Sequence, residues 1–158
     1  MMIIIKVLWE LSHMPLWKFY HPENAFSPED RQAIAERITG IYRALPKFYV
    51  GVVFQAVPRD SFFIGGEPAD DFVRIWVDHI ARTFADEDMK LRFLTACDRL
   101  LAPYIADRGL RWEMHVDETP FSLWTIQGVR PPLPDTAEEA RWISENRPQA
   151  YQAVAPAS

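Results

Sequence analysis

The sequence predicts an α/β protein in which two β-α-β units follow each other along the chain. Segments 28–44 and 86–104 have the 3.6-residue apolar period of helices, and each is flanked by segments with strand composition. Because parallel β-α-β crossovers are right-handed, both helices are expected on one side of a single sheet. The other side then needs a different cover, for which neighbouring subunits are the obvious candidate.

The first unit begins with the aromatic segment 15–20, which has strand composition and ends at the turn-forming residues 21–24 (His-Pro-Glu-Asn). Ser27 is a suitable N-cap for the helix 28–44, since a proline and two acids follow it. Segment 48–57 is nearly all apolar, which is typical of a central strand covered on both faces.

The second unit repeats this plan. A short strand at 62–64 runs into a turn at 65–68 (Gly-Gly-Glu-Pro), and segment 72–80 alternates between apolar and polar side chains. The helix 86–104 begins with three acids that suit its N-terminus. Alternation in 110–116 predicts a last strand with one polar face.

Residues 15–130 are expected to form the only domain. Residues 1–14 are either an extension or the result of a start codon placed too early, and 131–158 form an extended linker, a short helix and a flexible tail. Thr136 can cap that helix, whose expected docking residues are Trp142 and Ile143.

Composition and charge limit the classes of protein to which the chain can belong. The chain has 158 residues, a net charge of -5 and one cysteine, Cys97, which is expected to be buried and fits a reducing compartment. No charge footprint for nucleic acid is present, and the apolar start is far shorter than the ~20 residues that span a bilayer. A cytoplasmic protein without nucleic-acid or membrane partners is therefore expected.

No motif for a metal, nucleotide or other cofactor is found, so none is expected. More informative are polar side chains on otherwise apolar strands, which can converge on a ligand that carries a carboxylate, because arginine pairs bidentately with that group. The alternative is a solvated sheet edge or salt bridges between subunits. The residues concerned are Arg74, His79, Arg82, Arg111, Glu113 and His115.

Pro15 can have two different chemical roles. Inside a chain its nitrogen is a tertiary amide, without a proton or a usable lone pair. If translation began at Met14 and that methionine were removed, Pro15 would carry a free secondary amine. The alternative is that Pro15 merely opens an edge strand.

Four segments together resemble the tautomerase superfamily, in its cis-3-chloroacrylic acid dehalogenase-like branch: 14–22 (MPLWKFYHP), 35–39 (AERIT), 62–66 (FFIGG) and 112–120 (WEMHVDETP). The similarity covers roughly residues 15–132, with a C-terminal extension similar to those of fungal members. It implies a tandem β-α-β fold with a mixed four-stranded sheet, a homotrimer, and cofactor-independent catalysis by an amino-terminal proline, which falls on Pro15.

Other functional positions of the family carry over by the same resemblance. Its helix histidine falls on Tyr42 and its strand tyrosine on His115. Its two carboxylate-binding arginines fall near His79 and on Arg82. The water-activating glutamate of the dehalogenase is expected in 121–127, where this sequence has no acid.

These assignments predict a tautomerase that acts on a small 2-oxo acid or enol. Pro15 would move the proton, Arg82, with Arg74 as a second candidate, would hold the carboxylate, and Tyr42 or His115 would stabilise the developing enolate. A catalytically silent trimeric binding protein is the alternative from a different class. A hydratase or dehalogenase is a third possibility.

Overall fold

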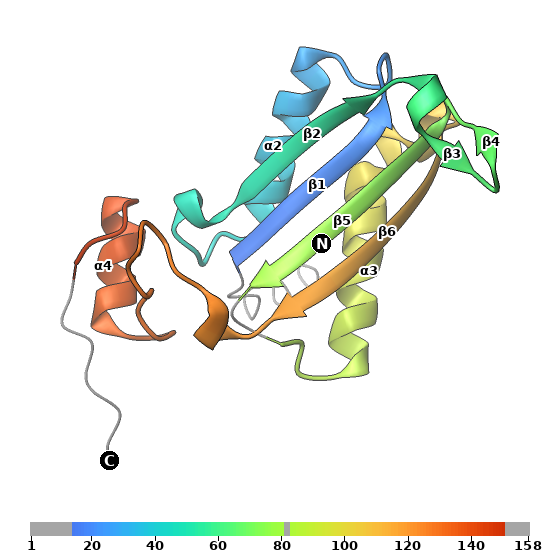
Figure 1. The fold of residues 1–158 in the computed structure, drawn as a ribbon. Helices are drawn as coiled ribbons and strands as arrows, with labels where there is room; N and C mark the ends of the chain where they lie inside the picture. Colours follow the sequence, from blue (N-terminus) through green and yellow to red (C-terminus); the bar gives the residue numbers. More distant parts are fainter. Residues whose placement is uncertain (1–13, 81–82, 151–158) are drawn as a thin grey trace.

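The computed structural model describes residues 14–80 and 83–150, and Figure 1 shows a twisted sheet with helices on one side. The sheet is mixed: the β1–β2 and β5–β6 pairs are parallel, whereas the central β1–β5 pair is antiparallel. This confirms two β-α-β units in tandem. The four strands, in the order in which they lie side by side, are β2 (Gly51–Val57), β1 (Met14–Pro22), β5 (Phe72–Ile80) and β6 (Arg111–Thr119).

Both long helices, α2 (Pro28–Ile41) and α3 (Glu87–Leu101), lie on the same face of the sheet, as expected (Figure 1). Ser27 and Asp30 form a capping box at the start of α2, and the Asp86 carboxylate accepts from the Met89 N–H at 2.7 Å at the start of α3. Each helix is about three residues shorter than predicted. The chain after α3 continues as a 3₁₀ turn, η4 (Ala102–Tyr104), because a proline follows Ala102.

The core lies between the sheet and these helices. Strands β1 and β5 alternate strictly, so every second side chain is buried against the helices, whereas the intervening ones face the open side. We call these two sides the helix-covered face and the open face. The largest fully buried side chains include Trp17, Phe19, Ile34, Ile38, Ile75, Phe93 and Leu101.

Two expectations about strand position were wrong. β2 is an edge strand, not a central one, and its Val53 is 49% exposed. β1 is an inner strand paired on both sides, so Pro15 does not open an edge strand. The strand composition of both segments was read correctly, but composition does not reveal strand order, because order depends on which distant segments pair.

The limits of β1 also differ from the prediction. His21 was placed in a turn, but the strand continues to Pro22 and His21 is fully buried. Its side chain packs among aromatic rings, with centroids 5.0 Å from Phe26 and 6.1 Å from Phe54. The turn follows only after this histidine.

A short hairpin projects from the end of the sheet, as Figure 1 shows. It pairs β3 (Phe63–Ile64) with β4 (Glu67–Pro68), a partner that the sequence analysis assigned to the turn. Gly65 and Gly66 turn the chain between them with φ angles of 61° and 87°, a region that favours glycine. The predicted glycine turn is therefore confirmed.

The C-terminal helix α4 (Ala137–Glu145) begins at the expected cap, where the Thr136 hydroxyl accepts from the Glu139 N–H at 3.3 Å. Trp142 is fully buried, as predicted for a docking residue, but Ile143 is 38% exposed. The predicted N-terminal extension (residues 1–13) and the end of the predicted tail (151–158) lie outside the described residues. Within residues 14–80 and 83–150, no helix is long and apolar enough to cross a membrane.

Candidate active site

The structure separates the predicted site residues into two groups. Pro15, Tyr42 and His79 lie on or against the helix-covered face, and all three are buried. Arg74 and His115 lie on the open face and contact each other. The sixth predicted residue, Arg82, lies outside the described residues.

Pro15 and His79 are direct cross-strand partners in the antiparallel β1–β5 pair. Directly opposite residues have Cα atoms about 4.5–5.5 Å apart and side chains on the same face of the sheet. The histidine is fully buried. An imidazole therefore stands beside the proline ring at the start of β1.

Tyr42, the C-cap of α2, connects this pair to the helix layer. Its Oη lies 3.0 Å from Nε2 of His79 and accepts a hydrogen bond from the Trp17 indole N–H at 3.2 Å. An indole can only donate, so the tyrosine hydroxyl hydrogen is available for the histidine nitrogen. Trp17, Tyr42 and His79 thus form one buried chain of polar groups from β1, α2 and β5.

The environment keeps the Tyr42 hydroxyl protonated. Burial raises its pKa well above the ordinary value of 10.0, and nearby Cys97 adds to this, whereas the hydrogen bond from Trp17 opposes it. A neutral phenol remains a hydrogen-bond donor at all physiological pH values. Chemically, Tyr42 can donate to a developing negative charge, but it cannot act as a base.

Aromatic rings surround His79 on its other sides. The ring centroids of Phe84 and Phe93 lie 5.0 Å and 4.8 Å from the imidazole centroid. The Phe84 N–H in turn donates to the Glu118 carboxylate at 2.8 Å, so β6 holds this segment in place. The end of the sheet where β1 begins is therefore a largely apolar site with a few oriented polar groups, as is common in ligand pockets.

The open face carries a different kind of cluster, which is charged. Arg74 forms a salt bridge with Glu113 and lies 3.0 Å from Nδ1 of His115. His115 also packs against Trp76, whose indole N–H donates to Asp117 at 2.8 Å. These contacts join neighbouring strands within one protomer, whereas the alternative interpretation was a solvated sheet edge or salt bridges between subunits.

Arg74 and His115 are remote from Pro15 within one protomer. Arg74 lies opposite Tyr20 in β1, and His115 lies opposite Trp76 in β5. Arg74 and His79 are five positions apart in β5, a distance of about 17 Å along the strand. Both side chains also lie on the other face of the sheet. They can join the site around Pro15 only if a neighbouring subunit supplies them.

One residue of the buried chain was missed by sequence reasoning. Trp17 is fully buried on the same face as Pro15, and its indole N–H supports Tyr42. The signal was present, because residues two apart in a strand share a face. The contact with Tyr42 was not visible, since it spans 25 residues.

Among residues 14–80 and 83–150, no group of three or more His, Cys, Asp or Glu side chains is placed to hold a metal ion.

Comparison with known proteins identifies relatives of the whole domain. The family described as "Putative oxalocrotonate tautomerase enzyme" matches residues 14–147. Native RhCC from Rhodococcus jostii RHA1 is 43% identical, with a TM-score of 0.82, over 86% of this chain and 99% of its own. A probable enzyme from the thermophilic fungus Aspergillus fumigatus is 38% identical, with a TM-score of 0.83, over 88% and 99% of the two chains. No protein of curated function matches the chain.

More distant structures share the fold. N1, a member of the cis-3-chloroacrylic acid dehalogenase (cis-CaaD) family, is 20% identical with a TM-score of 0.62, over 82% of this chain and 90% of its own. A fused 4-OT that forms a symmetric trimer is 14% identical with a TM-score of 0.58, over 72% and 93% of the two chains. The resemblance stated from the sequence is confirmed.

Proposed function

The chain belongs to the tautomerase superfamily, and we propose that it is an isomerase that interconverts the enol and keto forms of a small 2-oxo acid, with Pro15 as its base. The observation that carries this proposal is the position of Pro15 at the start of β1, directly opposite His79, whose Nε2 lies 3.0 Å from the Tyr42 hydroxyl. A nitrogen base, an imidazole and a neutral phenol are thus adjacent in an apolar environment.

The base requires a free amino terminus. In the chain as written, Pro15 follows Met14 and its nitrogen is an amide without a usable lone pair. In a chain that begins at Met14, removal of the methionine leaves a secondary amine at this position. Apolar surroundings disfavour the charged form of an amine, which lowers its pKa and provides the neutral base.

The reaction then needs one proton to move. The neutral Pro15 amine takes the hydroxyl proton of the enol, and the resulting ammonium returns a proton to the neighbouring carbon, which produces the keto form. During this transfer the negative charge on the substrate oxygen accepts a hydrogen bond from a neutral donor. Tyr42 is our candidate for that donor, in the state in which the Nε2–H of His79 donates to the tyrosine oxygen and the hydroxyl hydrogen is directed to the substrate.

The substrate carboxylate needs a cation at the same end of the sheet. Arg82 follows His79 by three residues in the chain, which makes it our first candidate. Arg74 and His115 are candidates only in an assembly, where the open face of a neighbouring subunit would bring them to Pro15. A homotrimer is therefore part of this proposal, and the trimeric relative of the same fold supports it.

Two alternatives have specific support. If the chain keeps residues 1–13, Pro15 is a buried amide that cannot act as a base. This favours a catalytically silent binding protein. Segment 121–127, which includes the 3₁₀ turn η6 (Phe121–Leu123), has no acid. The absence of an acid there argues against a hydratase or dehalogenase that depends on a glutamate in that segment.

The test compares two forms of the protein, one that begins at Met14 and one with all 158 residues. Mass spectrometry first establishes that the short form has lost Met14. We expect the short form to ketonise the enol of phenylpyruvate and the long form to be inactive, as measured by ultraviolet absorbance. Pro15→Ala in the short form leaves a primary amine and should lower kcat/KM about 10²-fold or less. Equal activity of the long and short forms would exclude Pro15 as the base.

The carboxylate contact is tested by Arg82→Lys in the short form. The substitution keeps the positive charge but loses the bidentate fork, so KM for the 2-oxo acid should rise while the melting temperature stays unchanged. Arg92→Lys, on the exposed side of α3, is the matched control. Normal turnover by Arg82→Ala would transfer the role to another arginine.

A further inference from the structure

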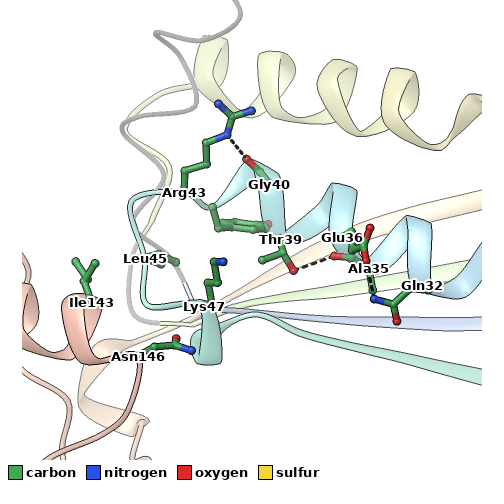
Figure 2. A pocket seen from close by; sticks show the side chains of 11 residues that line it. Gln32, Ala35, Glu36, Thr39, Gly40, Arg43, Leu45, Lys47, Ile143 and Asn146 are labelled. Atoms are coloured by element: carbon green, nitrogen blue, oxygen red, sulfur yellow. Dashed lines mark hydrogen bonds between the residues drawn. The ribbon is translucent and has the colours of Figure 1, made fainter.

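A cavity lies apart from Pro15 and His79. It has a volume of about 750 Å³ and is bounded by the C-terminal half of α2, by the 3₁₀ turn η2 (Lys47–Tyr49), and by the end of α4 (Figure 2). Small-molecule sites in proteins range from about 300 to 1,000 Å³. The cavity is therefore large enough for a metabolite.

The wall supplied by α4 is firmly attached. Trp142 is fully buried, with its ring 6.0 Å from that of Phe48 and 6.2 Å from that of Tyr49. The Phe48 N–H also donates to Oδ1 of Asn146 at 3.2 Å. The extension is thus part of the folded domain, and it places Ile143 and Asn146 on one side of the cavity.

Two cations line the cavity at different places. Arg43 donates through Nε to the Gly40 carbonyl at 3.0 Å, and Figure 2 shows its guanidinium directed away from Lys47. Figure 2 shows Lys47 extending from η2 towards α2. Among the ion pairs between described residues, none involves Arg43 or Lys47. The carboxylate in the wall, Glu36, instead accepts from Gln32 at 2.7 Å.

The rest of the lining is partly apolar. Leu45 is buried beneath the cavity, and Ile143 is 38% exposed although the neighbouring Trp142 is fully buried. A large apolar side chain directed into such a cavity gains from contact with a hydrocarbon group, because burial removes its surface from water. Cationic and apolar groups thus occur in the same space.

We propose that this cavity is a binding site for a small amphipathic carboxylate, with the carboxylate at Lys47 and the hydrocarbon portion against Leu45 and Ile143. The site is separate from the chemistry assigned to Pro15 and does not depend on it. Tyr42 contributes to the cavity wall, but its hydroxyl is engaged with Trp17 and His79. The C-terminal extension is what completes the site.

Isothermal titration calorimetry of the full chain with octanoate tests the proposal. We expect octanoate to bind, and acetate and octylammonium to bind at least about tenfold more weakly, since one lacks the hydrocarbon and the other reverses the charge. Lys47→Gln should weaken octanoate binding by about five- to tenfold, and Arg43→Gln should weaken it by less, because its guanidinium is directed away from Lys47. Arg92→Gln on α3 is the matched charge control and should leave the affinity unchanged.

A second measurement locates the ligand. In methyl NMR spectra, octanoate should shift the signals of Ile143, whereas those of Ile64 in the β3–β4 hairpin should stay in place. The proposal is overturned if octanoate does not bind, if octylammonium binds as tightly, or if Lys47→Gln binds like the wild type. It is also overturned if the Ile143 methyl signals do not move.

Discussion

Polar side chains lie in different environments on the two faces of the sheet. On the helix-covered face, His79 is fully buried and belongs to a chain of hydrogen-bonding groups with Tyr42 and Trp17. On the open face, His115 has a side chain that is 35% exposed and lies among charged partners. The two faces use the same residue types, so environment rather than composition determines what each histidine can do.

The two faces differ in the free energy that is lost when a polar group loses its hydrogen-bond or ion-pair partner. A buried polar atom that loses its partner costs about 1–3 kcal/mol, whereas an exposed ion pair contributes about 0–1 kcal/mol because water replaces it. Arg111 shows the second case: its guanidinium lies 2.6 Å from the Asp71 carboxylate, and the two side chains are 55% and 46% exposed. The helix-covered face is therefore expected to be sensitive to substitution, and the open face tolerant.

The largest expected difference between the faces concerns their tryptophans. Trp17→Ala removes a fully buried side chain, so the free energy of unfolding should fall by about 3–5 kcal/mol. Trp76→Ala removes a half-buried ring and one hydrogen bond to Asp117, and within an isolated protomer should cost about 1 kcal/mol. Urea denaturation of both variants measures the two values.

The same pair of variants also tests the assembly. If a neighbouring subunit covers the open face, Trp76→Ala should cost much more than about 1 kcal/mol and should lower the molar mass measured by light scattering. A monomer at micromolar concentration, in the wild type as well, would contradict the proposed trimer.

A smaller difference in stability is expected between two variants that each lose one tyrosine hydroxyl. Tyr42→Phe leaves the Trp17 indole without its partner and removes the Tyr42–His79 contact, so stability should fall by about 1–3 kcal/mol. Tyr20→Phe, on the open face, should change stability by less than about 0.5 kcal/mol. Chemical denaturation provides the comparison, and equal costs would show that the buried chain does not stabilise the fold.

The smallest effect concerns pH and the other buried histidine, His21. Burial is the main cause that lowers its pKa below 6.5, with Arg31 adding to the effect and the contact with the Pro22 carbonyl opposing it. Its folded-state pKa is therefore lower than its unfolded-state pKa. The native state then binds fewer protons, so this contribution to stability is present above pH 6.5 and decreases as the pH falls below it.

We expect this loss to amount to less than about 1 kcal/mol. His21→Phe should flatten the dependence of melting temperature on pH between 7 and 5. If the slope of the variant equals that of the wild type, His21 is not the group that titrates.

The sequence alone determined the elements that depend on local patterns. Alternation in segment 72–80 predicted β5 with its correct limits, and the caps Ser27 and Thr136 mark where α2 and α4 begin. These features involve neighbours within about four residues in the chain, so one sequence contains the whole signal. The resemblance to the family was likewise carried by short segments in a fixed order, and the structural relatives confirm it.

The tertiary structure alone decided which groups meet. It placed β2 at the edge, buried His21, and joined Tyr42 to His79 across 37 residues while Arg74 and His115 met on the other face across 41. Such contacts depend on strand order and on which distant segments pair. Alternation shows that successive side chains point to opposite faces, but it does not show what covers each face, because that cover comes from another part of the chain or from another subunit.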